Sequence, residues 1–299
     1  MSIHWRGVMP AITTAFNKDL TIDYGFIRQH CRWLAENGCT GIVTPGSLGE
    51  GATLTFEEKV RLWKTCVKSI SDRVPVIGAI SSLSTADAAR LAKSAADSGC
   101  TGLMVLPPYI YCGDWREMKG HVSVVFEATK LSCMLYNNPV AYGTDFLPEQ
   151  ICELAKEHRN LHAVKESSMD VRRITSIRIL AGERLAVFVG VDDTIVEGIK
   201  AGAVGWIAGL ANALPKESVK LFNDVLDGED KKANKLYKWF LPLLRMDTVP
   251  KFVQLIKLVQ EEVGMGNRRV RPPRLEVVGE ELAATRKMIR AALNRRPKV

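Results

Sequence analysis

One lysine of this chain lies inside an apolar run, where its amine could act as a nucleophile. Residues 161–168 read LHAVKESS, and Ala163 and Val164 directly precede Lys165. Burying an ammonium group is costly, and partial desolvation lowers the pKa of a lysine and raises its share of free amine. Such an amine can form a Schiff base with a carbonyl compound. A structural ion pair is the alternative, but Glu166 would point to the opposite face of a strand.

Other polar residues follow other apolar runs and could assist this chemistry. Tyr136 ends the run in SCMLYNNP, and its phenol could transfer protons during carbinolamine formation, although a tyrosine there can also serve core packing. The turn GSLGE offers N–H groups and the Ser47 hydroxyl to a carboxylate. Asn138 places an amide near the substrate or only shapes the turn before proline. Further candidates for the substrate pocket, also near the ends of apolar runs, are Tyr109, Tyr111, Gly190 and Ile207.

Short apolar runs alternate with segments of helical period and could position these residues. The runs are GVMPAITT, GIVTPGS, VPVIGAIS, GLMVLPP, SCMLYNNP, LHAVKES, AVFVGVDD and AVGWIAGL. Between them, segments such as YGFIRQHCRWLAENG and STADAARLAKSAADSG repeat apolar residues at three and four positions. The alternation predicts an α/β fold, a (β/α)8 TIM barrel, in which catalytic groups lie where strands end.

The predicted organisation is a barrel at residues 1–212 followed by about three helices, at 213–299, packed on it as one structural unit. Thr55 with Glu58 predicts a capping box at the start of one barrel helix. A doubly wound open sheet is the alternative, but it usually has a glycine-rich turn after its first strand, and this chain has PAITTAF there.

The composition is that of a soluble globular chain, with 46% hydrophobic and 25% charged residues. The net charge of +8 comes largely from arginines after residue 267, which we interpret as a solvated tail and helix rather than a nucleic-acid surface, because no aromatic residues interleave them. Seven scattered cysteines without a C-x-x-C pair favour reduced thiols and a cytoplasmic location. No leader or membrane-spanning run is visible.

Neither a metal site nor a cofactor motif is evident. The five histidines, at 4, 30, 121, 158 and 162, have no H-E-x-x-H or carboxylate spacing. No pyridoxal or nicotinamide fingerprint is present. We therefore expect no cofactor and no metal.

Taken together, the motifs resemble those of the dihydrodipicolinate synthase and N-acetylneuraminate lyase superfamily. The resemblance rests on GSLGEGATLT for its G-x-x-G-E turn, on YNNP for its Y-N-x-P, and on VKESS for its K-x-[ST] strand. It implies Lys165 as the imine-forming nucleophile and Tyr136 as the acid and base. It also implies that Gly46, Ser47 and Leu48 bind the carboxylate of a 2-oxo acid, and that the chain forms a homodimer or homotetramer.

Three positions depart from the lysine-pathway synthases that the chain resembles. Those enzymes carry two adjacent tyrosines, one reaching across a dimer interface, where Ile110 follows Tyr109 here. Their relay threonine is replaced by Leu48, so Ser47, Tyr111 or a water would carry the proton. Their carboxylate-binding arginine is replaced by Ala141. The sequence therefore predicts poor synthase activity.

The interpretation that we favour is a catabolic deaminase or dehydratase, similar to enzymes that act on a pyrroline-4-hydroxy-2-carboxylate. A pyruvate-dependent aldolase or 4-hydroxy-tetrahydrodipicolinate synthase is the alternative, because it would use the same lysine. A protein that binds a 2-oxo acid without turnover is the rival from another class. The expected partners are a 2-oxo acid or imino acid substrate and further copies of this chain, not nucleic acid or a membrane.

Overall fold

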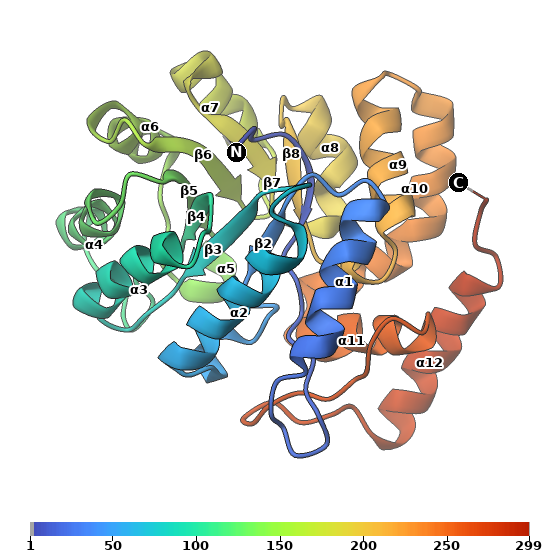
Figure 1. Cartoon of the computed structure of the whole chain (residues 1–299). Coiled ribbons are helices and arrows are strands. Elements are labelled where there is room, and N and C mark those ends of the chain that lie inside the picture. Colours follow the sequence, from blue (N-terminus) through green and yellow to red (C-terminus); the bar gives the residue numbers. More distant parts are fainter. Residues whose placement is uncertain (1–2, 299) are drawn as a thin grey trace.

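The computed structural model describes residues 3–298 and shows eight parallel strands in one sheet (Figure 1). Each of the eight apolar runs contains one of them. The strands are β1 (Gly7–Pro10), β2 (Ile42–Thr44), β3 (Val76–Ile80), β4 (Gly102–Val105), β5 (Ser132–Asn137), β6 (Leu161–Glu166), β7 (Ala186–Val189) and β8 (Gly205–Ala208).

The first and second strands meet and complete the barrel. The sheet order runs from β1 through β8 back to β2. The N–H of Ile12 donates to the carbonyl of Val43 at 2.9 Å, and that of Thr40 donates to Val8 at 2.8 Å. Each strand therefore has a neighbour on both sides, and the predicted (β/α)8 barrel is confirmed.

Helices cover the outside of the barrel because the connections between parallel strands cross its outer face. They are α1 (Tyr24–Glu36), α2 (Phe56–Ile70), α3 (Thr85–Asp97), α4 (Trp115–Glu127), α6 (Pro148–Glu157), α7 (Arg172–Ala181), α8 (Ile195–Lys200) and α9 (Pro215–Leu226), whereas the short helix α5 (Pro139–Tyr142) follows β5 at the mouth of the barrel. The capping box predicted at α2 is present: the N–H of Glu58 donates to the Thr55 hydroxyl at 3.2 Å, and that of Thr55 to the Glu58 carboxylate at 3.0 Å.

Within residues 3–298, four α-helices follow β8, whereas the sequence predicted about three. The first, α9, packs against α8 and β1 and is the eighth helix of the barrel ring. The other three are α10 (Asp230–Leu244), α11 (Phe252–Glu262) and α12 (Gly279–Leu293), and they gather on one side of the barrel (Figure 1). The barrel unit therefore extends past residue 212, because its last helix follows its last strand.

Two apolar cores hold these layers together. The larger lies between the sheet and the helices. The smaller fills the barrel interior and contains Met9, Val43, Ile77, Met104, Met134, Ala163, Phe188 and Ile207. Side chains of successive strand residues alternate between these two cores, so a lysine on the interior face of β6 must lie above packed apolar layers.

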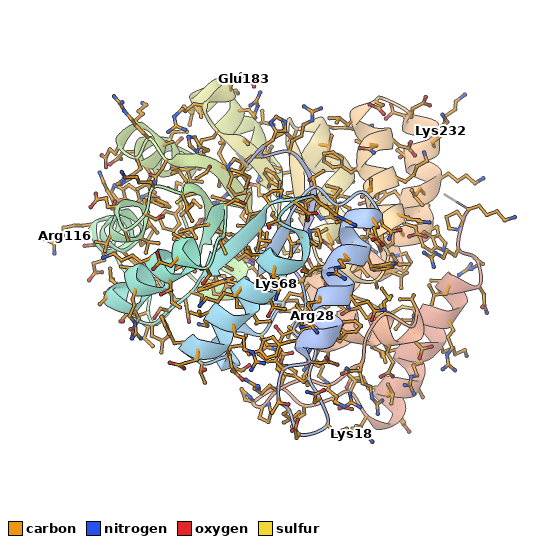
Figure 2. The ribbon with its side chains drawn as sticks, in the orientation of Figure 1. Lys18, Arg28, Lys68, Arg116, Glu183 and Lys232 are labelled. Carbon is orange, nitrogen blue, oxygen red and sulfur yellow. The ribbon has the colours of Figure 1, made fainter. Side chains whose placement is uncertain are left out.

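The sequence suggested that the arginine-rich C-terminal region is a solvated tail and helix. In the structure, several of these arginines form ion pairs with other elements instead. Arg271 makes two hydrogen bonds to Glu58 of α2, at 2.8 and 2.9 Å, while Arg286 pairs with Glu261 and Glu262. These ion pairs join the segment after α11 to the barrel and α12 to α11. The charged side chains labelled at the outer helices in Figure 2, such as Arg116 and Lys232, point away from the barrel.

Two other properties concern the cysteines and the helices. All seven cysteines are free; Cys112 is exposed and the others are buried. In residues 3–298, none of the helices combines the length and the apolar character that a membrane span requires.

Candidate functional site

A cavity of about 460 Å³ opens where the barrel strands end. This is the end at which barrel enzymes place their catalytic residues. Eight of the ten residues proposed from the sequence line it, and they come from several strands and the loops that follow them: Gly46, Ser47, Leu48, Tyr136, Asn138, Lys165, Gly190 and Ile207.

Lys165 and Tyr136 are direct neighbours across two strands. They are paired in the register of β6 and β5, and Nζ of Lys165 lies 3.9 Å from the centroid of the Tyr136 ring. Glu166 points the other way, where it accepts hydrogen bonds from Asn137 at 3.1 Å and from the N–H of Ser168 at 2.6 Å. The adjacent carboxylate therefore does not neutralise the lysine.

The surroundings of Lys165 favour its neutral amine. Burial lowers the pKa of Lys165, and the negative charges of Asp247 and Asp192 and the nearby Tyr142 oppose this effect. The side chain is 7% exposed, yet it lines the cavity and can be reached from it. A desolvated, reachable amine can attack a carbonyl or imine carbon.

Gly190 leaves the space that this lysine occupies. A Cβ at Gly190 would stand 2.6 Å from Cε of Lys165 and 1.9 Å from Oγ of Ser167. Any larger residue at the end of β7 would displace both side chains. Gly190 thus affects the site by leaving room for the Lys165 side chain. The sequence placed Gly190 near the substrate but did not indicate this role.

Asn138 holds the hydroxyl of Tyr136 and also shapes the turn. Its amide donates to the Tyr136 hydroxyl at 2.9 Å, and its carbonyl oxygen accepts from the N–H of Ala141 at 3.0 Å, which caps α5. Burial raises the pKa of Tyr136 to about 12, although the Asn138 amide opposes the rise. Tyr136 therefore keeps its proton at neutral pH and can donate it to a nearby atom.

A buried ion pair at Glu50, the last residue of the GSLGE turn, holds the turn in place. Lys257 of α11 donates to Glu50 at 2.5 Å, and both side chains are at most 1% exposed. The other Glu50 oxygen accepts from the N–H of Arg271 at 2.9 Å. Within residues 3–298, no acceptor takes the N–H of Ser47 or Leu48, so both groups can bind a carboxylate in the cavity.

Tyr142 is a site residue that the sequence reasoning missed. It ends α5, lines the cavity, and its hydroxyl shares a hydrogen bond with the Ser47 hydroxyl. Its ring meets that of Tyr136 edge to face, with centroids 5.8 Å apart. Ser47 and Tyr142 therefore place two hydroxyl groups of the same chain close to Tyr136.

Tyr109 and Tyr111 do not line the cavity. The chain turns outward after β4, so Tyr111 is 57% exposed and its hydroxyl donates to Glu117 at 3.0 Å. Tyr109 lies behind Tyr142, with ring centroids 5.7 Å apart, and bonds to Ser81 at 3.3 Å. Tyr109 thus supports Tyr142 from outside the cavity.

The cavity residues that were not proposed from the sequence include Ser167, Asp247 and Arg274. Ser167 follows Lys165 by two positions, and its buried hydroxyl has no hydrogen-bond partner within residues 3–298. Asp247 and Arg274 come from the C-terminal region. The K-x-[ST] motif pointed to Ser167, whereas no local pattern marks the other two.

The described part of the chain contains no group of three or more His, Cys, Asp or Glu residues that could bind a metal ion. His30, for example, is buried and bonds to the carbonyl of Asn212 at 2.9 Å.

Comparisons with known proteins show the family of the chain. The family model described as the dihydrodipicolinate synthetase family matches residues 4–292. A 4-hydroxy-tetrahydrodipicolinate synthase of Agrobacterium fabrum is 31% identical over 289 residues, which cover 97% of each chain.

Solved structures give the same result. Dihydrodipicolinate synthase DapA-2 of Bacillus anthracis is 28% identical with a TM-score of 0.93, covering 99% of this chain and 100% of its own. The chloride-inhibited synthase of Acinetobacter baumannii complexed with pyruvate is 26% identical with a TM-score of 0.91, covering 97% and 98%. The chain belongs to the dihydrodipicolinate synthetase family and is a Schiff-base lyase of that family.

Proposed function

We propose that this lyase is a deaminase of a five-membered cyclic imino acid that carries a hydroxyl on carbon 4. The observation that carries the proposal is the polar lining around Lys165. Ala141 stands where the resembling synthases have an arginine, and the Asn138 amide and the Asp247 carboxyl line the same cavity. These groups suit a substrate with hydroxyl and amino groups beyond its reacting carbon.

The reaction begins with an exchange of imines. The Lys165 amine adds to carbon 2 of the ring, the ring C–N bond breaks, and the nitrogen remains on carbon 5 as an amine. The N–H groups of Ser47 and Leu48 hold the carboxylate. Tyr136 supplies and recovers the protons of these steps, and Ser47 with Tyr142 connects its hydroxyl to further proton donors and acceptors.

Elimination and hydrolysis complete the balance. Loss of a proton from carbon 3 gives an enamine, which expels the hydroxyl of carbon 4 as water. Proton shifts turn the amine on carbon 5 into an imine. One water releases ammonia and leaves an aldehyde there, and a second frees Lys165 and leaves a 2-oxo acid. The net reaction consumes one water.

A second candidate is an aldolase or synthase with two substrates that each carry a carboxylate. Arg274 favours it, because this cation lines the cavity and makes no ion pair with the other described residues. A charge-assisted hydrogen bond of this type contributes about 1.5–3 kcal/mol. Arg274 could therefore bind the carboxylate that the synthases bind with an arginine at the position of Ala141.

A substrate panel separates the two candidates. We expect release of ammonia from the 4-hydroxylated cyclic imino acid, and little product from pyruvate with aspartate semialdehyde. Ammonia and carbonyl products would be measured by coupled assays, with the ring lacking the hydroxyl as the control. Strong condensation with the semialdehyde and no ammonia would refute the deaminase and favour the second candidate.

A further inference from the structure

The carboxyl of Asp247 reaches the cavity from outside the barrel sheet. It belongs to the 3-10 turn η5 (Arg245–Thr248), between α10 and α11. This turn contacts η3 (Asp192–Thr194), which follows β7. The C-terminal helices thus contribute an ionisable group to the site, and it lies close enough to Lys165 for their charges to affect each other's pKa.

The carboxyl group of Asp192 lies next to that of Asp247. It is fully buried and accepts hydrogen bonds from Nε1 of Trp206 at 2.9 Å and from the N–H groups of Gly209 and Leu210, at 2.9 and 2.7 Å. Oδ2 of Asp192 and Oδ1 of Asp247 lie 3.2 and 2.7 Å from the point where a Cβ on Gly209 would stand. The two carboxyl groups are therefore neighbours.

Two carboxyl groups in one buried site favour a state in which they share a proton, and burial together with the Asp247 charge raises the pKa of Asp192 well above its usual range. Asp192 has three N–H donors, which stabilise its charge. Asp247 receives no hydrogen bond from a described side chain, and the charge of Lys165, followed by the N–H of Asp192, opposes the effect of its burial. Burial raises the pKa of Asp247 to about 6, against the effect of the Lys165 charge. Both forms of Asp247 are therefore accessible near neutral pH, as an acid catalyst requires.

We propose that Asp247 is the catalytic acid that protonates the hydroxyl leaving from carbon 4. The inference rests on the proposed function, because it needs a substrate with a leaving group one carbon beyond the enamine. The Asp247 proton moves to the departing oxygen, the C–O bond breaks with the electrons of the enamine, and water leaves. Asp247 is then a carboxylate able to take the proton that carbon 5 loses next.

Replacement of Asp247 separates this role from imine formation. Asp247→Asn keeps the shape of the side chain but removes its acid, so turnover of the hydroxylated imino acid should fall by about 10²- to 10⁴-fold. Exchange of the methyl protons of pyruvate with deuterated water, followed by NMR, needs the Lys165 imine and enamine but no leaving group, and it should persist. Asp224→Asn is the matched control, because Asp224 is a buried aspartate of α9 outside the cavity.

Each outcome is decisive. Loss of turnover with retained pyruvate exchange supports the role of Asp247. Turnover near that of the wild type in Asp247→Asn overturns it and leaves the deaminase intact. If Asp247→Asn loses both turnover and pyruvate exchange, the proposed role is also overturned, because Asp247 would then be needed for imine formation by Lys165 or for folding. Pyruvate exchange by the wild type without any turnover of the hydroxylated substrate refutes the deaminase, and the role of Asp247 with it.

Discussion

Lys165→Met is expected to abolish turnover while leaving the fold intact. Methionine fills similar space but carries no nucleophile, and losing the nucleophile of a covalent mechanism costs on the order of 10⁶-fold in turnover. Steady-state assays with the best substrate of the panel measure the loss. Because burial already disfavours the Lys165 charge, the thermal midpoint should not fall.

The control for this variant is Lys59→Met. Lys59 is a half-buried lysine of α2 outside the cavity, with Nζ 3.4 Å from the carbonyl of Ser81. It should stay active. If Lys165→Met turned over substrate at a rate comparable to that of Lys59→Met, covalent catalysis by Lys165 would be wrong.

Tyr142→Phe should lower turnover by about 10²- to 10⁴-fold, as expected for a group that transfers protons. The change removes the hydroxyl bonded to Ser47 but keeps the ring that meets Tyr136 edge to face. Combination with Tyr136→Phe should cost less than the product of the two single effects, because groups that act as one unit are not additive.

Tyr24→Phe is the matched control, since Tyr24 lies on α1 under the Arg61 guanidinium and outside the cavity. The two variants would be compared in the same assay, with far-UV circular dichroism to check folding. Similar rates for Tyr142→Phe and Tyr24→Phe would show that the hydroxyl of Tyr142 moves no proton in a limiting step.

The barrel could be predicted because its signals are local. Each parallel strand is buried on both faces and is therefore a short apolar run, and each helix shows its own period. The same logic placed Tyr136 and Lys165 at one mouth, and their register pairing agrees. The sequence could not show that α9 packs against α8 and β1, because a helix does not show in its own sequence which layer it covers.

The rest of the cavity depends on contacts between distant segments. Tyr142 lies on the four-residue helix α5, too short for a periodic pattern. Asp247 reaches the cavity from the turn between α10 and α11, and Arg274 from the segment after α11, so both depend on how these distant segments pack. Tyr109 and Tyr111 were misplaced because the loop after β4 turns outward, where Glu117 binds Tyr111. A polar aromatic residue just past YNNP was the one available signal for Tyr142.

Borohydride reduction in the presence of pyruvate tests the central claim most directly. If Lys165 forms the imine, reduction should fix one pyruvate-derived group on the peptide that contains Lys165, as read by mass spectrometry. Neither the Lys165→Met variant nor the unreduced protein should carry it. An unmodified Lys165 at saturating pyruvate and across a panel of other 2-oxo acids, or a label on another lysine such as Lys257, would contradict the account.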